Sequence, residues 1–447
     1  MIRNLSRQSA ALAGLCLFLA GHAHAAAPDL LEVYQAAQAS DPTLRSAMAT
    51  LDVARQKLPE ARAALMPTVA LTGNYNTTQA STQFTGDPLI NRDANYRNWS
   101  LQLTQPLFRA GNFIGNHQAE FIVGSAEAQF EHARQDLIVR VAQAYFSVNE
   151  AQDAIAAADA QVNAMSEQLA QITQGMKTGT KAMTDVDDTT SRLASARAQR
   201  VSAQGDLDNA LADLQKITGS LYGRLAPLRE NIALARPQPA DIVAWIDQSR
   251  SNHPVVRAQE LALEAARLDI QRAQAEHLPT VDLVVNSTHS NTNHSLTTPE
   301  DYGTHGIQHQ VGVQINVPLF AGGSVVAKVA EAEGNRNKSE SDLEAARRDA
   351  ASDAQHAYAG VTNGLAQVDA LTIAVQSGEN AVKGNRAGFR FGVRANVDVL
   401  NAEQQLYAAQ RDLSKARYDV LLQGLKLKAA AGILAEDDVE RVTSLMH

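Results

Sequence analysis

The chain has 447 residues, of which 45% are hydrophobic, 19% are charged and only 5% are aromatic. Its net charge is −9, from 39 Lys and Arg against 48 Asp and Glu with no basic block, which argues against a nucleic-acid-binding protein. A single cysteine excludes a disulfide framework and cysteine-based metal sites, and beyond the N-terminus no run of about 18 apolar residues predicts a transmembrane helix.

The first 25 residues predict a secretory signal peptide. Arg3 and Arg7 precede an apolar run over 10–20, and residues 23–25 (Ala-His-Ala) form a small-x-small cleavage signal. The lone Cys16 lies inside the apolar run and lacks the small preceding residue of a lipoprotein signal, so we expect no lipid anchor. The mature protein then leaves the cytoplasm without a cysteine.

Two copies of one unit make up the mature chain. Matching residues recur from Pro42 and Pro254 at a constant offset of 212, and up to Gly219 and Gly432 at 213 after one inserted residue. Such long-range self-similarity indicates an internal duplication. We predict a first repeat over 28–221, a Pro-rich linker over 222–239, a second repeat over 240–434 and a C-terminal tail over 435–447.

Each repeat predicts the same series of elements. A short helix comes first (30–39; 242–249), then a helix of about 22 residues that ends before Pro67 or Pro279, and then two strands. A very long helix (112–173; 324–386), a glycine-containing turn and a last helix (185–218; 398–431) follow. At 1.5 Å per residue, about 60 helical residues span about 90 Å, a length that suits a tube rather than a globular domain.

The strands, predicted at about 67–79, 95–105, 279–288 and 307–317, alternate between apolar and polar residues. Trp99, Leu101 and Leu103 face one way and the polar residues between them face the other. A half-buried sheet of a soluble domain would alternate similarly. Strands of about 10 residues with long polar loops over 77–95 and 287–306 favour an outer-membrane barrel, in which Tyr75, Tyr96 and Trp99 could be interfacial aromatics or plain strand residues.

Four strands cannot close a barrel, and open edges in lipid leave backbone groups unpaired. Several chains must therefore pool their strands. Two chains would supply eight strands and three would supply twelve, and the periodicity does not choose between them.

The last helix of each repeat shows a heptad pattern. The positions in the second repeat are Val399, Leu406, Leu413, Val420 and Leu427, and those in the first are Val186, Leu193, Arg200, Leu207 and Leu214. A strict heptad indicates a left-handed coiled coil, although an ordinary helical bundle would also account for it. We expect these helices to project from the barrel into the periplasm.

These features together resemble the TolC-like outer-membrane efflux proteins. The resemblance is carried by the duplication, by the strand-to-helix turns at 105–108 (QPLF) and 317–323 (VPLFAGG), and by 390–403 (RFGVRANVDVLNAE). It implies an α+β membrane protein, a homotrimer whose twelve-stranded barrel continues into a coiled-coil tunnel. It also implies contact with outer-membrane lipid, a periplasmic adaptor, and an inner-membrane ABC transporter or proton-driven pump, with no cofactor and no enzymatic activity.

The resemblance also assigns a periplasmic aperture to the turns before the last helices. Asp398 matches an aspartate that rings the constriction, and Asp185 is its counterpart in the first repeat. One helical turn further the family has a second aspartate, where this chain has Asp188 and Asn401. Rings of acids would favour cations. The alternative is that Asp185 is an ordinary helix-terminal acid, with Thr184 as the N-cap.

Family gate links join an arginine, a tyrosine and a threonine–aspartate pair. Arg394, Thr184 and Asp185 match, but Phe389 stands where the tyrosine would be and cannot form its hydrogen bond.

Two sets of turn residues complete the predicted site. The first set is expected to permit positive φ and to face the adaptor: Gly175, Gly179, Gly388 and Gly392. The second set is expected to form the strand-to-helix turns: Pro106, Gly111, Pro318 and Gly323.

No other chemistry is indicated. Four histidines bracket one external loop without tight ligand spacing, so no metal site is predicted: His289, His294, His305 and His309. Phosphate-binding and hydrolase motifs are lacking. The sequence therefore predicts an export duct for proteins (type I secretion) or small molecules, and the alternative is a secreted coiled-coil structural or adhesin protein.

Overall fold

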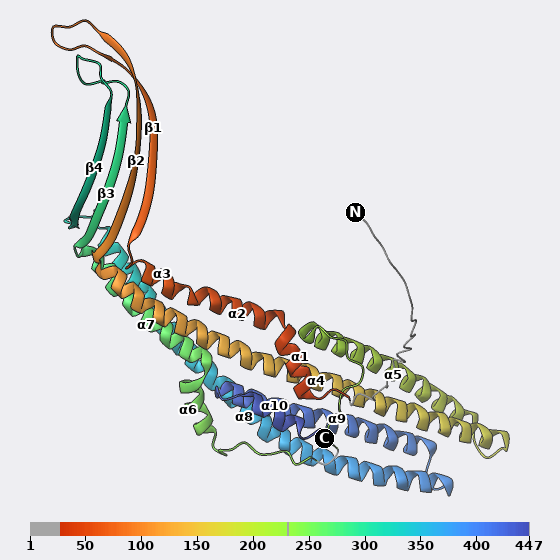
Figure 1. Cartoon of the computed structure of the whole chain (residues 1–447). Helices are drawn as coiled ribbons and strands as arrows, with labels where there is room; N and C mark the ends of the chain where they lie inside the picture. The colour runs from red at the N-terminus through yellow and green to blue at the C-terminus, as the bar shows by residue number, and fades with distance from the viewer. Residues whose placement is uncertain (1–26, 230–231, 447) are drawn as a thin grey trace, which may run out of the picture.

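The structure is a computed structural model that describes residues 27–229 and 232–446. Long helices extend from the base of a curved sheet, and their hairpin turns lie at the end farthest from the strands (Figure 1). The predicted signal peptide lies outside the described residues. Among the described residues, no helix is both long enough and apolar enough to cross a membrane.

Both halves of the chain contain the same series of elements. The first half contains α1 (Leu30–Ser40), α2 (Pro42–Arg55), α3 (Lys57–Ala63), β1 (Thr68–Thr82), β2 (Ile90–Phe108), α4 (Ala110–Lys177) and α5 (Met183–Thr218). The second contains α6 (Ile242–Asn252), α7 (Pro254–Gln274), the 3-10 turn η1 (Ala275–His277), β3 (Thr280–Thr292), β4 (Thr304–Asn316), α8 (Ser324–Arg390) and α9 (Asn396–Ala430), and α10 (Glu436–Thr443) follows.

The two halves differ in the helix that precedes the strands. In the first half this helix is interrupted at Gln56 and forms α2 and α3, whereas in the second half α7 is continuous. Pro59 explains the break, because it has no N–H to donate to the carbonyl of Arg55 and its ring crowds that carbonyl. The corresponding residue of α7 is Gln271, which carries an N–H.

The four strands form one antiparallel sheet in the order β1-β2-β3-β4, so β1 and β4 are its edges within this chain. The strands have 15, 19, 13 and 13 residues and are longer than predicted, because both hairpins continue into the segments expected to be loops. The β1–β2 ladder reaches Thr82 and Ile90, and the β3–β4 ladder reaches Thr292 and Thr304.

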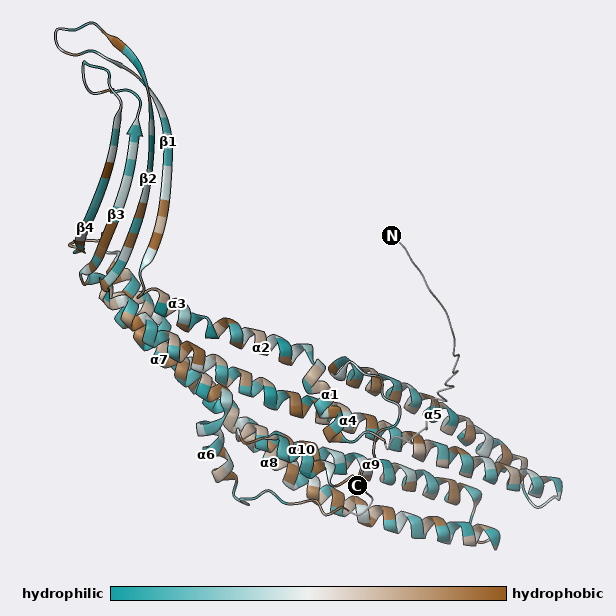
Figure 2. Ribbon diagram, in the orientation of Figure 1, coloured by the Kyte–Doolittle hydropathy of each residue, from teal (hydrophilic) through white to brown (hydrophobic). Residues whose placement is uncertain are grey.

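The register confirms that the sheet has one apolar face and one polar face. Leu71, Leu101, Ser287 and His309 form one cross-strand row, and the neighbouring row toward the helices is Val69, Leu103, Val285 and Val311. Hydrophobic residues are concentrated in the half of the strands nearer the helices (Figure 2). Tyr75 and Trp99 lie on this face, but Tyr96 lies on the opposite face, which favours the alternative of a plain strand residue for Tyr96.

The main core lies midway along the helices, where α1, α4, α5, α9 and α10 meet. Leu30, Val141 and Leu214 are fully buried in it. The segments predicted as linker and tail belong to this core. The Tyr145 hydroxyl donates to the Ala226 carbonyl at 2.8 Å, and Val439 of α10 is buried.

Heptad positions pack along the hairpins. Val399, Leu413, Val420 and Leu427 are buried in α9. The exception expected in the first repeat, Arg200, is exposed and pairs with Asp159 of α4. Hairpin α4–α5 contacts hairpin α8–α9 mainly through α4 and α9, and α7 packs against both α4 and α8.

Candidate functional site

The hairpin tips farthest from the sheet hold most of the predicted site. The chain reverses between Lys177 and Met183 in the first hairpin and between Arg390 and Asn396 in the second. Gly179 and Gly392 both have φ +73°, a conformation that favours glycine, so their predicted positive φ is confirmed.

For Gly175 and Gly388 the predicted positive φ is wrong. They lie inside α4 and α8 and not at positive φ. A Cβ at Gly175 would be 2.7 Å from the Cγ of Lys181, and one at Gly388 would be 2.7 Å from the Cγ of Arg394. These glycines therefore make room for a basic side chain that crosses the last helical turn.

Asp185 and Asp398 occupy equivalent positions at the start of α5 and α9. Asp185 Oδ2 accepts the N–H of Ala182 at 3.4 Å, and Asp398 Oδ2 accepts the N–H of Ala395 at 3.2 Å. Each carboxylate satisfies one of the free amides of its helix N-terminus and lies favourably in the helix dipole. Because α5 begins before Thr184, that residue lies within the first turn, and the prediction of Thr184 as N-cap is wrong.

The remaining gate candidates are dispersed around the tips. Arg394 Nη1 lies 4.0 Å from Asp398 Oδ2 of the same hairpin. In the described part of the chain no hydrogen bond joins it to Thr184 or Asp185, and Asp188 is exposed. The Lys181 ammonium of the first hairpin lies over the Phe389 ring, 3.7 Å from its centroid. This cation–π contact joins the two hairpins.

A buried polar bridge, which the sequence reasoning missed, also joins the hairpins. Gln168 Nε2 of α4 donates to Asn396 Oδ1 at 2.7 Å, and Asn396 Nδ2 donates to Thr189 Oγ1 of α5 at 3.0 Å. All three side chains are buried. The one signal in the sequence was a polar residue, Asn396, at the first position of the last helix.

Two further polar contacts lie beyond the bridge. Arg192 of α5 donates to Asn401 of α9 at 2.9 Å, which gives Asn401 a link between hairpins where a second acid was expected. The buried Glu403 accepts from Arg386 of α8 at 2.7 Å and ties α8 to α9.

The predicted strand-to-helix turn is found between β4 and α8, but not between β2 and α4. Pro106 lies within β2, beside an irregularity of the β2–β3 ladder, and Gly111 lies in the first turn of α4. Pro318 follows β4, and Gly323, at φ +82°, precedes α8. Arg109 and Asp282 form a bidentate ion pair of 2.9 and 2.7 Å that holds α4 against β3.

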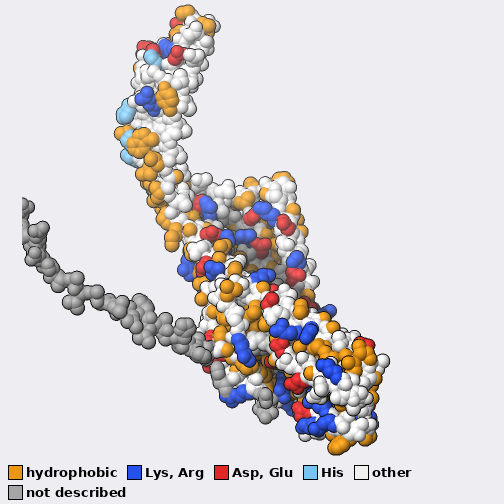
Figure 3. Space-filling view, turned by 90° about the vertical axis from the view of Figure 1, so that its right-hand side faces the viewer, with side chains coloured by type: hydrophobic (Ala, Val, Ile, Leu, Met, Phe, Trp, Pro, Cys, Tyr) orange, Lys and Arg blue, Asp and Glu red, His pale blue; other side chains and the backbone are white. Residues whose placement is uncertain are grey.

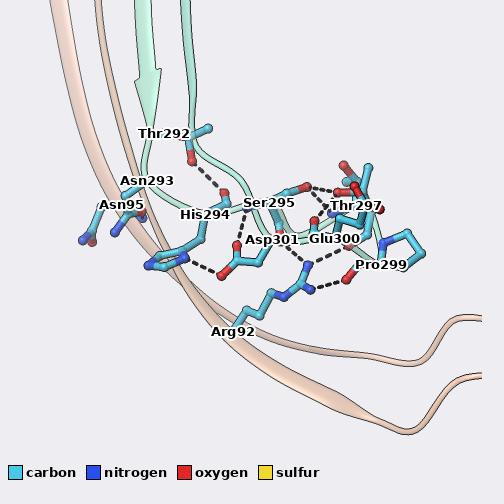
Figure 4. A network of polar contacts seen from close by, with 11 residues as sticks. Arg92, Asn95, Thr292, Asn293, His294, Ser295, Thr297, Pro299, Glu300 and Asp301 are labelled. Carbon is cyan, nitrogen blue, oxygen red and sulfur yellow. Dashed lines mark hydrogen bonds and ion pairs between the residues drawn. The ribbon is translucent and has the colours of Figure 1, made fainter.

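At the opposite end of the sheet, the loop after β3 folds over β2. Arg92 donates to the carbonyl oxygens of Ser295, Thr298 and Pro299, and His294 pairs with Asp301 at 2.8 Å (Figure 4). The His294 imidazole lowers the pKa of the Asp301 carboxyl. Within 27–229 and 232–446, no three His, Cys, Asp or Glu side chains are grouped to hold a metal ion.

The comparisons with known proteins agree with this architecture. The profile of the family described as "Outer membrane efflux protein" matches twice, over residues 33–220 and 245–433. The chain belongs to this family. It is 33% identical to the outer membrane protein TolC of Escherichia coli (strain K12), over 92% of this chain and 84% of TolC. It is therefore an outer-membrane export channel, whose sheet lies in the membrane and whose helices lie in the periplasm.

Two other similarities bear on its fold and role. The alkaline protease secretion protein AprF of Pseudomonas aeruginosa is 32% identical, over 93% of this chain and 86% of AprF. The crystal structure of the outer membrane protein VceC of Vibrio cholerae matches with a TM-score of 0.75 at 20% identity, over 90% of this chain and 96% of VceC. Family membership favours the channel over a secreted coiled-coil adhesin.

Proposed function

We propose that three copies of the chain form one barrel of twelve strands, continuous with a tunnel made of the helical hairpins. The observation that carries this proposal is the four-stranded sheet with one apolar face, one polar face and two open edges. In lipid both edges need partner strands. Two copies would close a barrel of eight strands, and side chains fill the interior of such a small barrel. An export duct needs an open lumen, which a larger barrel provides.

We propose further that this duct serves a tripartite system, with a periplasmic adaptor and an inner-membrane transporter, and that its main cargo is protein. The relative AprF supports this choice, since its name states protease secretion. The test compares proteins in the culture medium of a deletion strain and its parent. Loss of one secreted protein from the medium, with its accumulation in cells, supports protein secretion. An unchanged secreted set together with new drug sensitivity would support efflux by a proton-driven pump instead.

The hairpin tips are the proposed periplasmic aperture. The turns at Gly179 and Gly392 would face the adaptor, and three copies of Asp185 and Asp398 would line the mouth, with Asp188 one turn further along. A ring of carboxylates attracts cations, so a multivalent cation added from the periplasmic side should block the current. Asp398→Asn should weaken this block in bilayer recordings. Unchanged block in both Asp398→Asn and Asp185→Asn would exclude these aspartates from the mouth.

A further inference from the structure

Cationic side chains lie on the apolar face of the sheet, at the end farther from the helices. The register places Arg97 and His305 in one cross-strand row with Tyr75 and Asn291. The next row toward the helices contains Trp99 and His289, and the following one contains His309. We call this group, Arg97, His289, Asn291, His305 and His309, the outer cationic patch. Histidine side chains (pale blue) are visible along the strand region beside hydrophobic ones (Figure 3).

The patch lies at the boundary of the apolar band. From Val281 and Ile315 up to Leu71 and Leu101, apolar residues dominate this face. Val281 and His289 are eight residues apart, which is about 27 Å along a strand. A strand tilt of about 45° turns this into a height of about 19 Å, and the row of Arg97, Asn291 and His305, two residues further along, comes to about 24 Å, which matches the apolar band of about 25 Å in outer-membrane barrels. Arg97 and His305 therefore lie level with the headgroups of the outer leaflet, and His289 and His309 lie just inside that level.

Aromatic rings hold two of the nitrogen-containing side chains of the patch in place. The His289 imidazole is stacked on Trp99 at 3.9 Å between centroids and 9° between planes. The Arg97 guanidinium lies over the Tyr75 ring, 5.3 Å from its centroid. Since His289 is turned toward β2, it is turned away from the histidines of β4, which accords with the lack of a grouped metal site among the described residues.

The polar groups of the patch have no polar partner within the described chain. Arg97, the three histidines and Asn291 form no side-chain hydrogen bond or ion pair there, whereas Arg92 and Arg109 are satisfied by carbonyls and by Asp282. The rows contain no carboxylate. Asp93, the next acid on this face of β2, is four residues from Arg97, or about 14 Å. A guanidinium beside an apolar band without a counter-charge is costly.

We propose that the outer cationic patch binds the phosphate of a lipid headgroup in the outer leaflet. Arg97 would supply paired N–H donors, which suit phosphate geometry, and the imidazoles and the Asn291 amide would supply further donors. The apolar rows below would contact the acyl chains of the same lipid. The proposal rests on the membrane placement of the sheet, and it does not depend on the cargo or the aperture.

The test is native mass spectrometry of the full-length protein in non-ionic detergent, titrated with phosphatidic acid. Diacylglycerol, which lacks the phosphate, is the comparison lipid, and inorganic phosphate is the competitor. Phosphatidic acid should bind at least about tenfold more tightly than diacylglycerol, and inorganic phosphate at the same concentration should not displace it. Displacement by an equal amount of inorganic phosphate would show a free-anion site and overturn the lipid assignment.

Variants locate the binding. Arg97→Gln should weaken phosphatidic acid binding about tenfold, whereas Arg336→Gln, which removes one charge from the distant helix α8, should leave it unchanged. Equal binding by Arg97→Gln and Arg336→Gln would overturn the proposal. Bilayer currents of both variants show separately whether the channel still conducts, so a loss of lipid binding can be told apart from a loss of channel function.

Discussion

Gly432 offers a sharp test of how the end of α9 packs within the second repeat. It follows α9 at φ +71°, and a Cβ there would lie 2.3 Å from the backbone oxygen of Asn252 and 2.7 Å from its carbonyl carbon. Its counterpart in the first repeat, Gly219, has φ +69°, but a Cβ there would lie 3.7 Å from the Cβ of Ser40. Ser40 and Asn252 are themselves equivalent, so the chain contains its own matched control.

The expected cost of Gly432→Ala follows from these distances. Both alanine variants incur the strain of a left-handed conformation, about 1–2 kcal/mol. Only Gly432→Ala adds an overlap with backbone atoms, which have no rotamer to relieve it, at about 1–3 kcal/mol. We therefore expect about 1–2 kcal/mol for Gly219→Ala and about 2–5 kcal/mol for Gly432→Ala.

Hydrogen exchange measures these local free energies directly. Each 1.4 kcal/mol is a factor of about ten, so amides around Gly432 should lose roughly 30-fold to several-thousand-fold of their protection in Gly432→Ala. Amides around Gly219 should lose about 5- to 30-fold in Gly219→Ala. Each variant's unaltered repeat serves as its internal reference. Equal losses of protection at the two positions would refute the argument that backbone crowding distinguishes them.

Three further predictions follow from other contacts. Burial, aided by the nearby His132, lowers the pKa of His253 to about 4, and its neutral imidazole accepts the Val255 N–H at the start of α7. The unfolded chain therefore binds the extra proton between about pH 6.5 and 4, and stability falls by about 2 kcal/mol as the pH drops through this window. His253→Asn, which keeps a capping acceptor, should flatten that dependence in thermal unfolding scans, and an unchanged profile would assign it to other groups. Asn396→Ala removes the acceptor of the buried Gln168 amide at a cost of about 1–3 kcal/mol, so bilayer recordings should show a larger resting conductance. Lys181→Gln should raise the resting conductance less than Asn396→Ala does, since an exposed cation–π contact contributes about 0.5–1 kcal/mol. A larger rise in Lys181→Gln than in Asn396→Ala would contradict this ranking of the two contacts.

Sequence reasoning was most successful where a pattern is local or repeated. The alternation around Trp99 assigned the apolar face correctly, and the hairpin helices were found within a few residues of their ends. Strand lengths were underestimated, because polar residues such as Asn95 and Thr292 look like loop residues yet continue a ladder once a partner strand lies beside them. The packing of the C-terminal tail could not be predicted for a similar reason: the apolar spacing of α10 has meaning only against α1.

The amino-acid sequence by itself determined the duplication, the membrane-type strands and the very long helices, because periods of 2, 3.6 and about 212 residues are properties of the chain alone. Only the tertiary structure decided which distant side chains meet. Gln168 bridges to Asn396, Lys181 covers Phe389, and Arg97 shares a cross-strand row with His305 because the two repeats pack side by side in one register. Neither composition nor spacing encodes that register, since it results from the burial of both repeats against one another.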